Sequence, residues 1–171
     1  MKIKYLLVFL ATLVTLVMPA GCGKSGSINT VAMDPNALKT VTDAADFKQI
    51  SSGWAERLED VAAATDKVYN EWSAGRIGRD EFAAQTRELY KETKRLKTES
   101  GYNIVFSLSE SDRELVDYDL VTGAYNKALI QMNDFLYLLP TLEEEQVKEA
   151  YEYTGEIVED ELDNVKRTLK I

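Results

Sequence analysis

Residues 111–139 read SDRELVDYDLVTGAYNKALIQMNDFLYLL, the most apolar helical pattern in the chain. Apolar residues recur in it at every third or fourth position, which is the spacing of one face of a helix. Because that face is wide, we expect this helix to lie deepest in the core. The capping-box pattern of Ser111 and Glu114 predicts its start, and Pro140 predicts its end. The face consists of Leu115, Tyr118, Val121, Thr122, Tyr125, Leu129, Met132, Phe135, Leu136 and Leu139.

On both sides of this stretch, the same spacing predicts further long helices. Two precede it, over residues 42–73 and 79–100, and glycines at positions 75 and 78 bracket the turn between them. One follows it, from a second capping-box pattern at residues 141–144 almost to residue 171. Short connections make neighbouring helices antiparallel. We therefore predict an all-α fold over residues 42–171, an up-down bundle of four long helices made of two antiparallel hairpins.

Residues 102–108 alternate apolar and polar side chains, which is the period of a strand. The sequence offers no second strand pattern to pair with them, and an isolated strand is not stable. We therefore expect this segment to be an extended crossover laid on the bundle.

The N-terminal segment has the organisation of an export signal. Lys2 and Lys4 precede an uncharged apolar run over residues 5–17. That run is shorter than the ~20 residues of a membrane span and fits a secretory signal. It ends in Ala20-Gly21-Cys22, which resembles the lipobox of bacterial lipoproteins, although Pro19 stands where that family usually has Leu.

The resemblance implies that Cys22 is diacylated on its sulfur and becomes the mature N-terminus. Residues 1–21 are then the signal peptide, and residues 22–41 are a lipidated, flexible tether. We expect the protein on the extracytoplasmic face of the cell membrane, held there by acyl chains. For a Gram-negative source, the outer membrane is the alternative location. Cys22 is the only cysteine of the chain, which agrees with a modified position.

Composition excludes several kinds of chemistry. The chain has no histidine, which removes Ser-His-Asp and Cys-His catalysis and every metal site with a His ligand. Loss of residues 1–21 removes two lysines and no acid, so the net charge moves from −9 to −11. Such a charge argues against nucleic acid as a partner. We predict no catalytic, cofactor-binding or metal-ligating residue and no cofactor, so the protein is not expected to be an enzyme.

The acidic residues gather in the second half of the chain. Carboxylates at positions 152, 156, 159, 160 and 163 fall opposite the apolar face of the last helix, so we expect them to face water. The helix over residues 79–100 is basic towards its end, which favours pairing with acidic helices of this chain or of another molecule. Tyrosines are frequent: Tyr69, Tyr90, Tyr102, Tyr118, Tyr125, Tyr137, Tyr151 and Tyr153.

These observations favour a non-enzymatic protein-interaction or scaffolding module of the cell envelope, with an envelope protein as partner. The sequence pattern predicts no particular oligomeric state. The alternative is a small-ligand or cation binding protein that uses a tyrosine-lined or acidic site between helices.

Overall fold

The computed structural model describes residues 38–171. The predicted signal peptide (1–21), the lipidation site Cys22 and residues 23–37 of the predicted tether lie outside the described residues. The described residues are 83% helical, with five α-helices and one pair of short strands, which confirms the all-α prediction. No helix within this range combines the length and the apolar character that crossing a membrane requires.

The first two long helices agree with the sequence pattern. Helix α1 spans Ala44–Ser73, and the Asp43 carboxylate caps it by accepting from the amides of the next turn. Helix α2 spans Arg79–Thr98. The turn between them needs Gly75, because its φ of 68° lies in the left-handed region that side chains disfavour.

A strand pair follows where the sequence suggested no pairing. Helix α2 continues into a π-helical turn, η3 (Glu99–Asn103), and then into strand β2 (Ile104–Phe106). Strand β2 pairs in parallel with strand β1 (Lys39–Val41), and Val41 lies opposite Phe106. The expectation that residues 102–108 have no partner strand is therefore wrong. The partner is three residues long, too short to show a period in the sequence, and it lies within the predicted tether.

The apolar stretch that begins at residue 111 forms two helices where we expected one. Helix α3 (Glu110–Leu115) is capped by Ser109, whose hydroxyl accepts from the amide of Asp112, so the predicted cap at Ser111 is wrong. The chain then breaks at Asp117, which adopts φ 48° and ψ 49°. Helix α4 (Tyr118–Leu138) starts after this left-handed residue. The spacing of apolar residues passes through the break, which is why the pattern did not reveal it.

The last helix also starts later than its predicted cap. A short 3-10 turn, η4 (Leu139–Thr141), contains Pro140, and helix α5 spans Glu144–Leu169. Glu143 is the cap, and its own amide donates to the side chain of Gln146 at 3.0 Å. The prediction of a capping box at residues 141–144 is wrong by two positions. Thr141 instead donates its hydroxyl to the carbonyl oxygen of Leu138.

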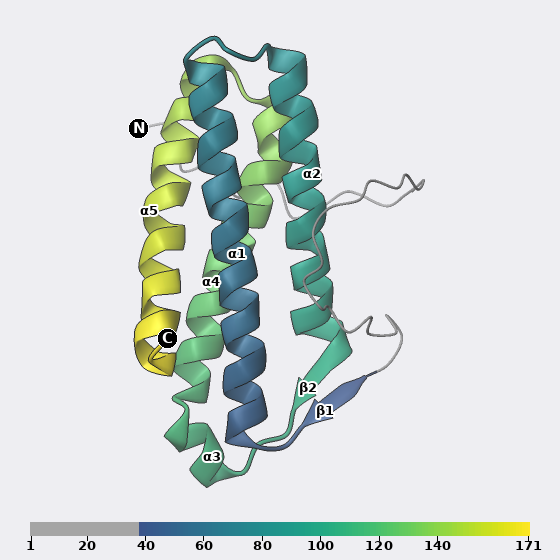
Figure 1. The fold of residues 1–171 in the computed structure, drawn as a ribbon, viewed down its shortest axis with the longest axis vertical. Helices are drawn as coiled ribbons and strands as arrows, with labels where there is room; N and C mark the ends of the chain where they lie inside the picture. Colours follow the sequence, from purple (N-terminus) through teal and green to yellow (C-terminus); the bar gives the residue numbers. More distant parts are fainter. Residues whose placement is uncertain (1–37) are drawn as a thin grey trace. The chain divides into compact units, whose positions relative to one another are not determined.

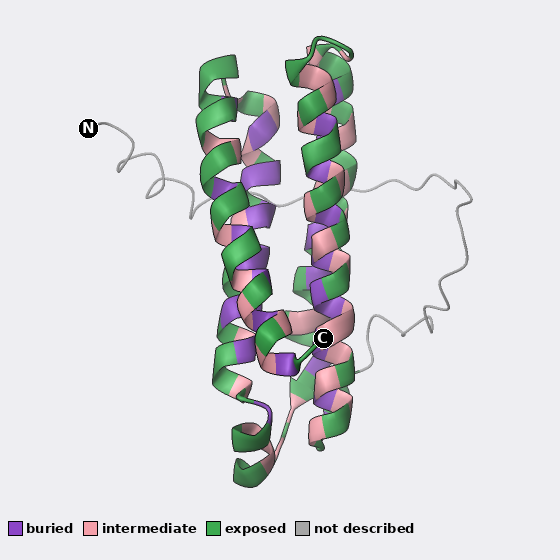
Figure 2. Cartoon of the chain, turned by 60° about the vertical axis from the view of Figure 1, so that its left-hand side comes forward, coloured by how far each residue is buried: buried purple, intermediate pink, exposed green. Residues whose placement is uncertain are grey.

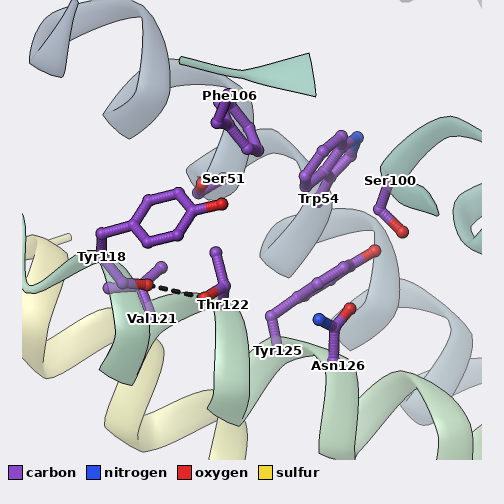
Figure 3. Close-up of a pocket in the computed structure, with 9 residues that line it drawn as sticks. All are labelled: Ser51, Trp54, Ser100, Phe106, Tyr118, Val121, Thr122, Tyr125 and Asn126. Atoms are coloured by element: carbon purple, nitrogen blue, oxygen red, sulfur yellow. Dashed lines mark hydrogen bonds between the residues drawn. The ribbon is translucent and has the colours of Figure 1, made fainter. Parts of the chain in front are cut away.

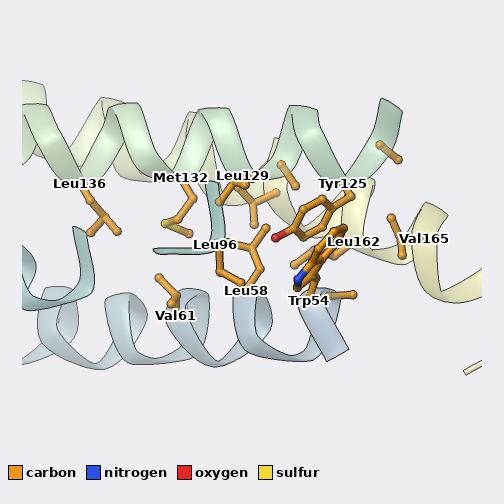
Figure 4. Close-up of a cluster of buried hydrophobic side chains, with 14 of the residues drawn as sticks. Trp54, Leu58, Val61, Leu96, Tyr125, Leu129, Met132, Leu136, Leu162 and Val165 are labelled. Carbon is orange, nitrogen blue, oxygen red and sulfur yellow. The ribbon is translucent and has the colours of Figure 1, made fainter. Parts of the chain in front are cut away.

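The four long helices pack side by side, and α4 contacts the other three (Figure 1). Nine of the 21 residues of α4 are buried, the largest share among these helices, so its predicted place in the core is confirmed. Buried residues recur at intervals along each of the long helices, between intermediate and exposed ones (Figure 2). The centre of the core joins α1, α2, α4 and α5 through Leu58, Leu96, Leu129 and Leu162 (Figure 4).

The ion pairs differ from the expected pairing of a basic helix with acidic neighbours. On α2, Lys91 pairs with Glu88 and Arg95 with Glu92, within the helix itself. Among residues 38–171, none of the basic side chains of α2 pairs with an acid of α4 or α5, so an internal pairing of that kind is not formed. Helices α4 and α5 are instead joined by Lys127 and Glu161, at 2.5 Å.

Candidate functional site

Between the helices of the described part of the chain, we compare two hollows that differ in their chemistry. The larger, here called the acidic groove, has a volume of about 590 Å³ and is lined by residues of α1, α4 and α5. Its rims carry seven carboxylates, and Lys166 is the one basic side chain in its lining. The rim residues are Glu59, Asp60, Asp66, Glu152, Glu156, Glu159 and Asp163.

The floor of the acidic groove is apolar. Met132 and Phe135 of α4 lie at its base, and Val158 and Leu162 of α5 line it as well. Each of these four side chains is at most 5% exposed and belongs to the core, so the apolar surface that the groove offers to a partner is that of Ala62, Ala63 and Tyr151, which are partly or fully exposed. On α5 an acid directly follows Val158 and another follows Leu162, and the period of a helix turns these two core residues inward and the acids, Glu159 and Asp163, to the rim.

Some rim carboxylates already have partners. Lys166 pairs with Glu59 at 2.6 Å and with Asp163 at 3.2 Å, and Asp66 accepts the hydroxyl of Tyr151 at 2.9 Å. Burial, followed by the hydrogen bond to Asp66, raises the pKa of Tyr151 to about 12, so this hydroxyl keeps its proton at physiological pH. The remaining rim acids (Asp60, Glu152, Glu156 and Glu159) form no ion pair with the described residues.

The predicted exposure of the acids on α5 is confirmed, since residues 152, 156, 159, 160 and 163 all face solvent. Within residues 38–171, no three acidic side chains lie close enough together to hold a metal ion. The carboxylates of the groove are thus spread along its rims.

The smaller hollow, here called the aromatic cavity, is lined in part by strand β2 (Figure 3). Figure 1 shows the strand pair at one end of the bundle. It has a volume of about 170 Å³. Helix α1, the turn η3, strand β2 and helix α4 each contribute to its wall. Its lining is Ser51, Trp54, Ser100, Phe106, Tyr118, Val121, Thr122, Tyr125 and Asn126.

Aromatic rings dominate this cavity. Trp54 stacks on Tyr125 with ring centroids 5.5 Å apart, and it meets Phe106 edge-on at 5.8 Å. Phe106 lies 6.0 Å from the ring of Tyr118, also edge-on. Figure 3 shows the Tyr118 ring and hydroxyl reaching between Ser51 and Thr122. Two of the eight tyrosines singled out in the sequence thus meet in one cavity.

The other tyrosines lie apart from this cavity. Tyr69 stacks on Tyr151 at 3.7 Å beside the acidic groove, and Tyr90 packs near Tyr137 between α2 and α4. Tyr102 and Tyr153 are exposed. Sequence reasoning missed Trp54 and Phe106 as members of the cavity, because both fit a core pattern equally well and because Phe106 reaches it only through the strand pair.

Close to the aromatic cavity, a charged network ties α1 to α2 and η3. Arg57 binds Glu92 and Glu99, at 2.5 Å in each case. Burial lowers the pKa of Arg57, but the hydrogen bonds and charges of Glu99 and Glu92 outweigh it, so the pKa is raised overall. Since both acids are already engaged by the guanidinium, the network fixes the end of α2 and leaves the cavity wall itself uncharged.

Comparison of the chain with protein-family models, with curated proteins and with solved structures finds no match. The chemistry of the two hollows is therefore what points to a function.

Proposed function

We propose that this protein is a lipid-anchored, extracytoplasmic interaction module that binds a basic amphipathic helix of an envelope protein in its acidic groove. The observation that carries the proposal is the pairing of an apolar floor with rims that hold seven carboxylates and one lysine. The role is non-enzymatic scaffolding: the chain supplies a rigid, charged docking surface at a membrane.

The arrangement of the helices supports this role. We infer that α1, α2, α4 and α5 form an up-down bundle of two antiparallel hairpins, because short connections join α1 to α2 and α4 to α5. In such a bundle α1 and α5 are neighbours, and their acidic sides flank one trough. A groove built on long helices needs little rearrangement when a partner binds, so the free-energy cost of ordering the interface is low.

The dimensions and charge of the acidic groove suit a helix. Its lining on α5 runs from Tyr151 to Lys166, which at ~1.5 Å per residue is a length of about 22 Å, or roughly four turns of a partner helix. Amphipathic helices bind such grooves with their apolar face down. Lysine and arginine on the flanks of the partner would meet Glu152, Glu156 and Glu159, while acidic partners would be repelled.

Anchoring follows from the N-terminal pattern. Acyl chains on Cys22 hold the protein at a bilayer, since two chains suffice where one binds only marginally. Replacement Cys22→Ala is expected to move the protein from the membrane fraction to the soluble fraction, and mass spectrometry of the purified wild-type protein should find acyl groups on residue 22. An unmodified thiol at this position would refute the anchor and leave the groove proposal intact.

The docking proposal is tested with a synthetic amphipathic helix of lysine and leucine, four turns long. Titration is expected to show binding that weakens as salt is added, because surface charge pairs are screened. Glu156→Lys should weaken binding severalfold. The matched control is Asp160→Lys, the same charge change on the same helix, at an exposed residue outside the groove.

A second readout identifies the partner in cells. A photo-crosslinking amino acid is placed at position 156 or, as a control, at position 160. The proposal expects one basic envelope protein to be crosslinked from 156 and not from 160, and the adduct to disappear when Glu152→Lys and Glu159→Lys are added. Equal adducts from both positions, or a peptide affinity that is unchanged in Glu156→Lys, would contradict the docking proposal.

A further inference from the structure

The hydroxyl of Tyr125 is a buried polar group whose role the packing of the described residues does not explain. Tyr125 is 3% exposed, and its oxygen has no hydrogen-bond partner among the described residues. Buried polar groups are almost always paired, because leaving a hydroxyl unpaired in an apolar setting costs roughly 1–3 kcal/mol. A phenylalanine at this position would fill the same space without that cost. The hydroxyl therefore points to a role beyond packing.

The surroundings of Tyr125 are the least regular part of the bundle. Ser100 lies in the π-helical turn η3, Phe106 lies in the strand pair, and Tyr118 directly follows the left-handed Asp117. All three line the aromatic cavity. π-Helical turns and strained residues concentrate at functional sites, because regular packing does not retain them on its own. Three departures from regular structure thus converge on one cavity.

The size and walls of the cavity define what it can hold. Its 170 Å³ is close to an apolar cavity of ~150 Å³ that holds one benzene molecule in another protein. Trp54, Phe106 and Tyr118 present ring faces and edges, which favour a flat ligand. None of the lining residues carries a charged side chain, and the nearby Arg57 is already bound by Glu92 and Glu99. A neutral ligand is therefore favoured over an ion.

We propose that the aromatic cavity binds a small, neutral, planar molecule that accepts a hydrogen bond from the hydroxyl of Tyr125. The ligand class is a single aromatic ring with a carbonyl or similar acceptor. Figure 3 shows the Tyr125 hydroxyl directed towards Ser100, on the side of the cavity where Asn126 is exposed. A ligand enters past these two residues, with its ring between Trp54 and Tyr118 and its acceptor towards Tyr125.

The electrostatics of Tyr125 suit a donor. Burial is the main cause that raises its pKa, and the charges of Glu99 and Glu92 add to it against the opposing effect of Arg57. The phenol therefore remains protonated throughout the physiological range and offers a hydrogen bond at any such pH. This site is independent of the acidic groove, so failure of either proposal leaves the other standing.

The test compares two probes of nearly equal shape, acetophenone and α-methylstyrene, which differ by a carbonyl oxygen in place of a methylene group. Binding is followed by NMR through the indole N–H signal of Trp54. Wild-type protein is expected to bind acetophenone about fivefold more tightly than α-methylstyrene, the usual effect of one neutral hydrogen bond. Tyr125→Phe should abolish this difference and leave the affinity for α-methylstyrene unchanged.

Tyr153→Phe is the matched control, since it removes the same hydroxyl from an exposed position on α5 and should keep the fivefold preference. A thermal melt of each variant verifies that it is folded, and Tyr125→Phe should melt at or above the wild-type temperature because an unpaired buried group is lost. The proposal is overturned if neither probe shifts the Trp54 signal, or if the preference for acetophenone survives in Tyr125→Phe.

Discussion

Arg79 donates a hydrogen bond to the carbonyl oxygen of Leu139 at 3.0 Å, across 60 residues of sequence. The same Nη2 nitrogen donates to the carbonyl oxygen of Leu142 at 2.5 Å. These carbonyls lie at the end of α4 and in the link to α5, where helical hydrogen bonds run out. A cation at the start of one helix thus completes the end of another, while its guanidinium lies over the rings of Trp72 and Phe82.

Loss of this contact should be costly. Arg79→Met keeps an apolar chain over the rings but removes a charged donor from two carbonyls, so we expect the free energy of unfolding to fall by roughly 1.5–3 kcal/mol. Urea denaturation measures the change. Arg87→Met, at an exposed residue of the same helix with no ion pair among the described residues, should stay within about 0.5 kcal/mol of wild type. Equal stability of the two variants would refute the capping role of Arg79.

Asp117 should respond to substitution through its backbone. Its φ of 48° is tolerated best by glycine, then by asparagine and aspartate, and worst by β-branched residues. We expect Asp117→Gly to be neutral or stabilising and Asp117→Val to lower stability by roughly 1–2 kcal/mol. Thermal melts of the two variants test the order. If Asp117→Val is as stable as Asp117→Gly, residues 115–118 must continue as one helix, as the sequence pattern alone indicated.

Strand β1 contributes one buried side chain to the strand pair. Val41 is 1% exposed, and its carbonyl oxygen accepts the amide of Ser107 at 2.8 Å. Val41→Ala removes core contacts from a three-residue strand, so we expect local opening and a loss of hydrogen-exchange protection at the Ser107 amide of about tenfold, since ~1.4 kcal/mol changes an equilibrium tenfold. Thr40→Ala, at the exposed neighbour, should change this protection little. Unchanged exchange in Val41→Ala would show that the pairing does not depend on this side chain.

Alkaline pH should destabilise the protein in part through Tyr151. Its pKa is raised from 10.0 to about 12 in the folded state, so the unfolded chain loses this proton first. The contribution of Tyr151 is complete below pH 10 and is lost as pH rises from 10 towards 12. Urea melts across this range should therefore show a shallower loss of stability for Tyr151→Phe than for wild type. Tyr153→Phe serves as the control and should lose stability with pH as steeply as wild type. If its stability falls as gently as that of Tyr151→Phe, the assignment to Tyr151 is contradicted.

The helical faces could be predicted from the sequence because a period of 3.6 residues follows from burial on one side. Val121, Leu129 and Leu136 were expected on the core face of their helix, and all three are buried, whereas Leu115, expected on the same face, is 68% exposed at the end of α3. What failed was local: the caps at Ser109 and Glu143, the break at Asp117 and the pairing of β1 with β2. The caps and the break depend on the backbone angles of single residues, and the pairing depends on a contact between distant segments. Neither kind of feature produces a periodic pattern in the sequence.

The same limit applies to the candidate sites. The exposed acids of α5 could be predicted, but their position opposite Glu59 and Asp60 of α1 depends on how two helices separated by 70 residues of sequence come together. Tyr118 and Tyr125 were recognised as aromatic, yet the cavity that they share is completed by Ser100 and Phe106, which reach it through a π-helical turn and a strand. Tertiary pairing, which a pattern along one chain does not record, assembles both hollows.

The parallel strand pair has a mechanical consequence. If Cys22 is fixed in a bilayer, any pull on the folded unit enters through Lys39 and passes along β1 before it reaches α1. Backbone hydrogen bonds then share the load with β2, the segment that holds Phe106 against Trp54. Under that condition, tension would strain one wall of the aromatic cavity first, and the affinity of the proposed ligand would fall with the applied force.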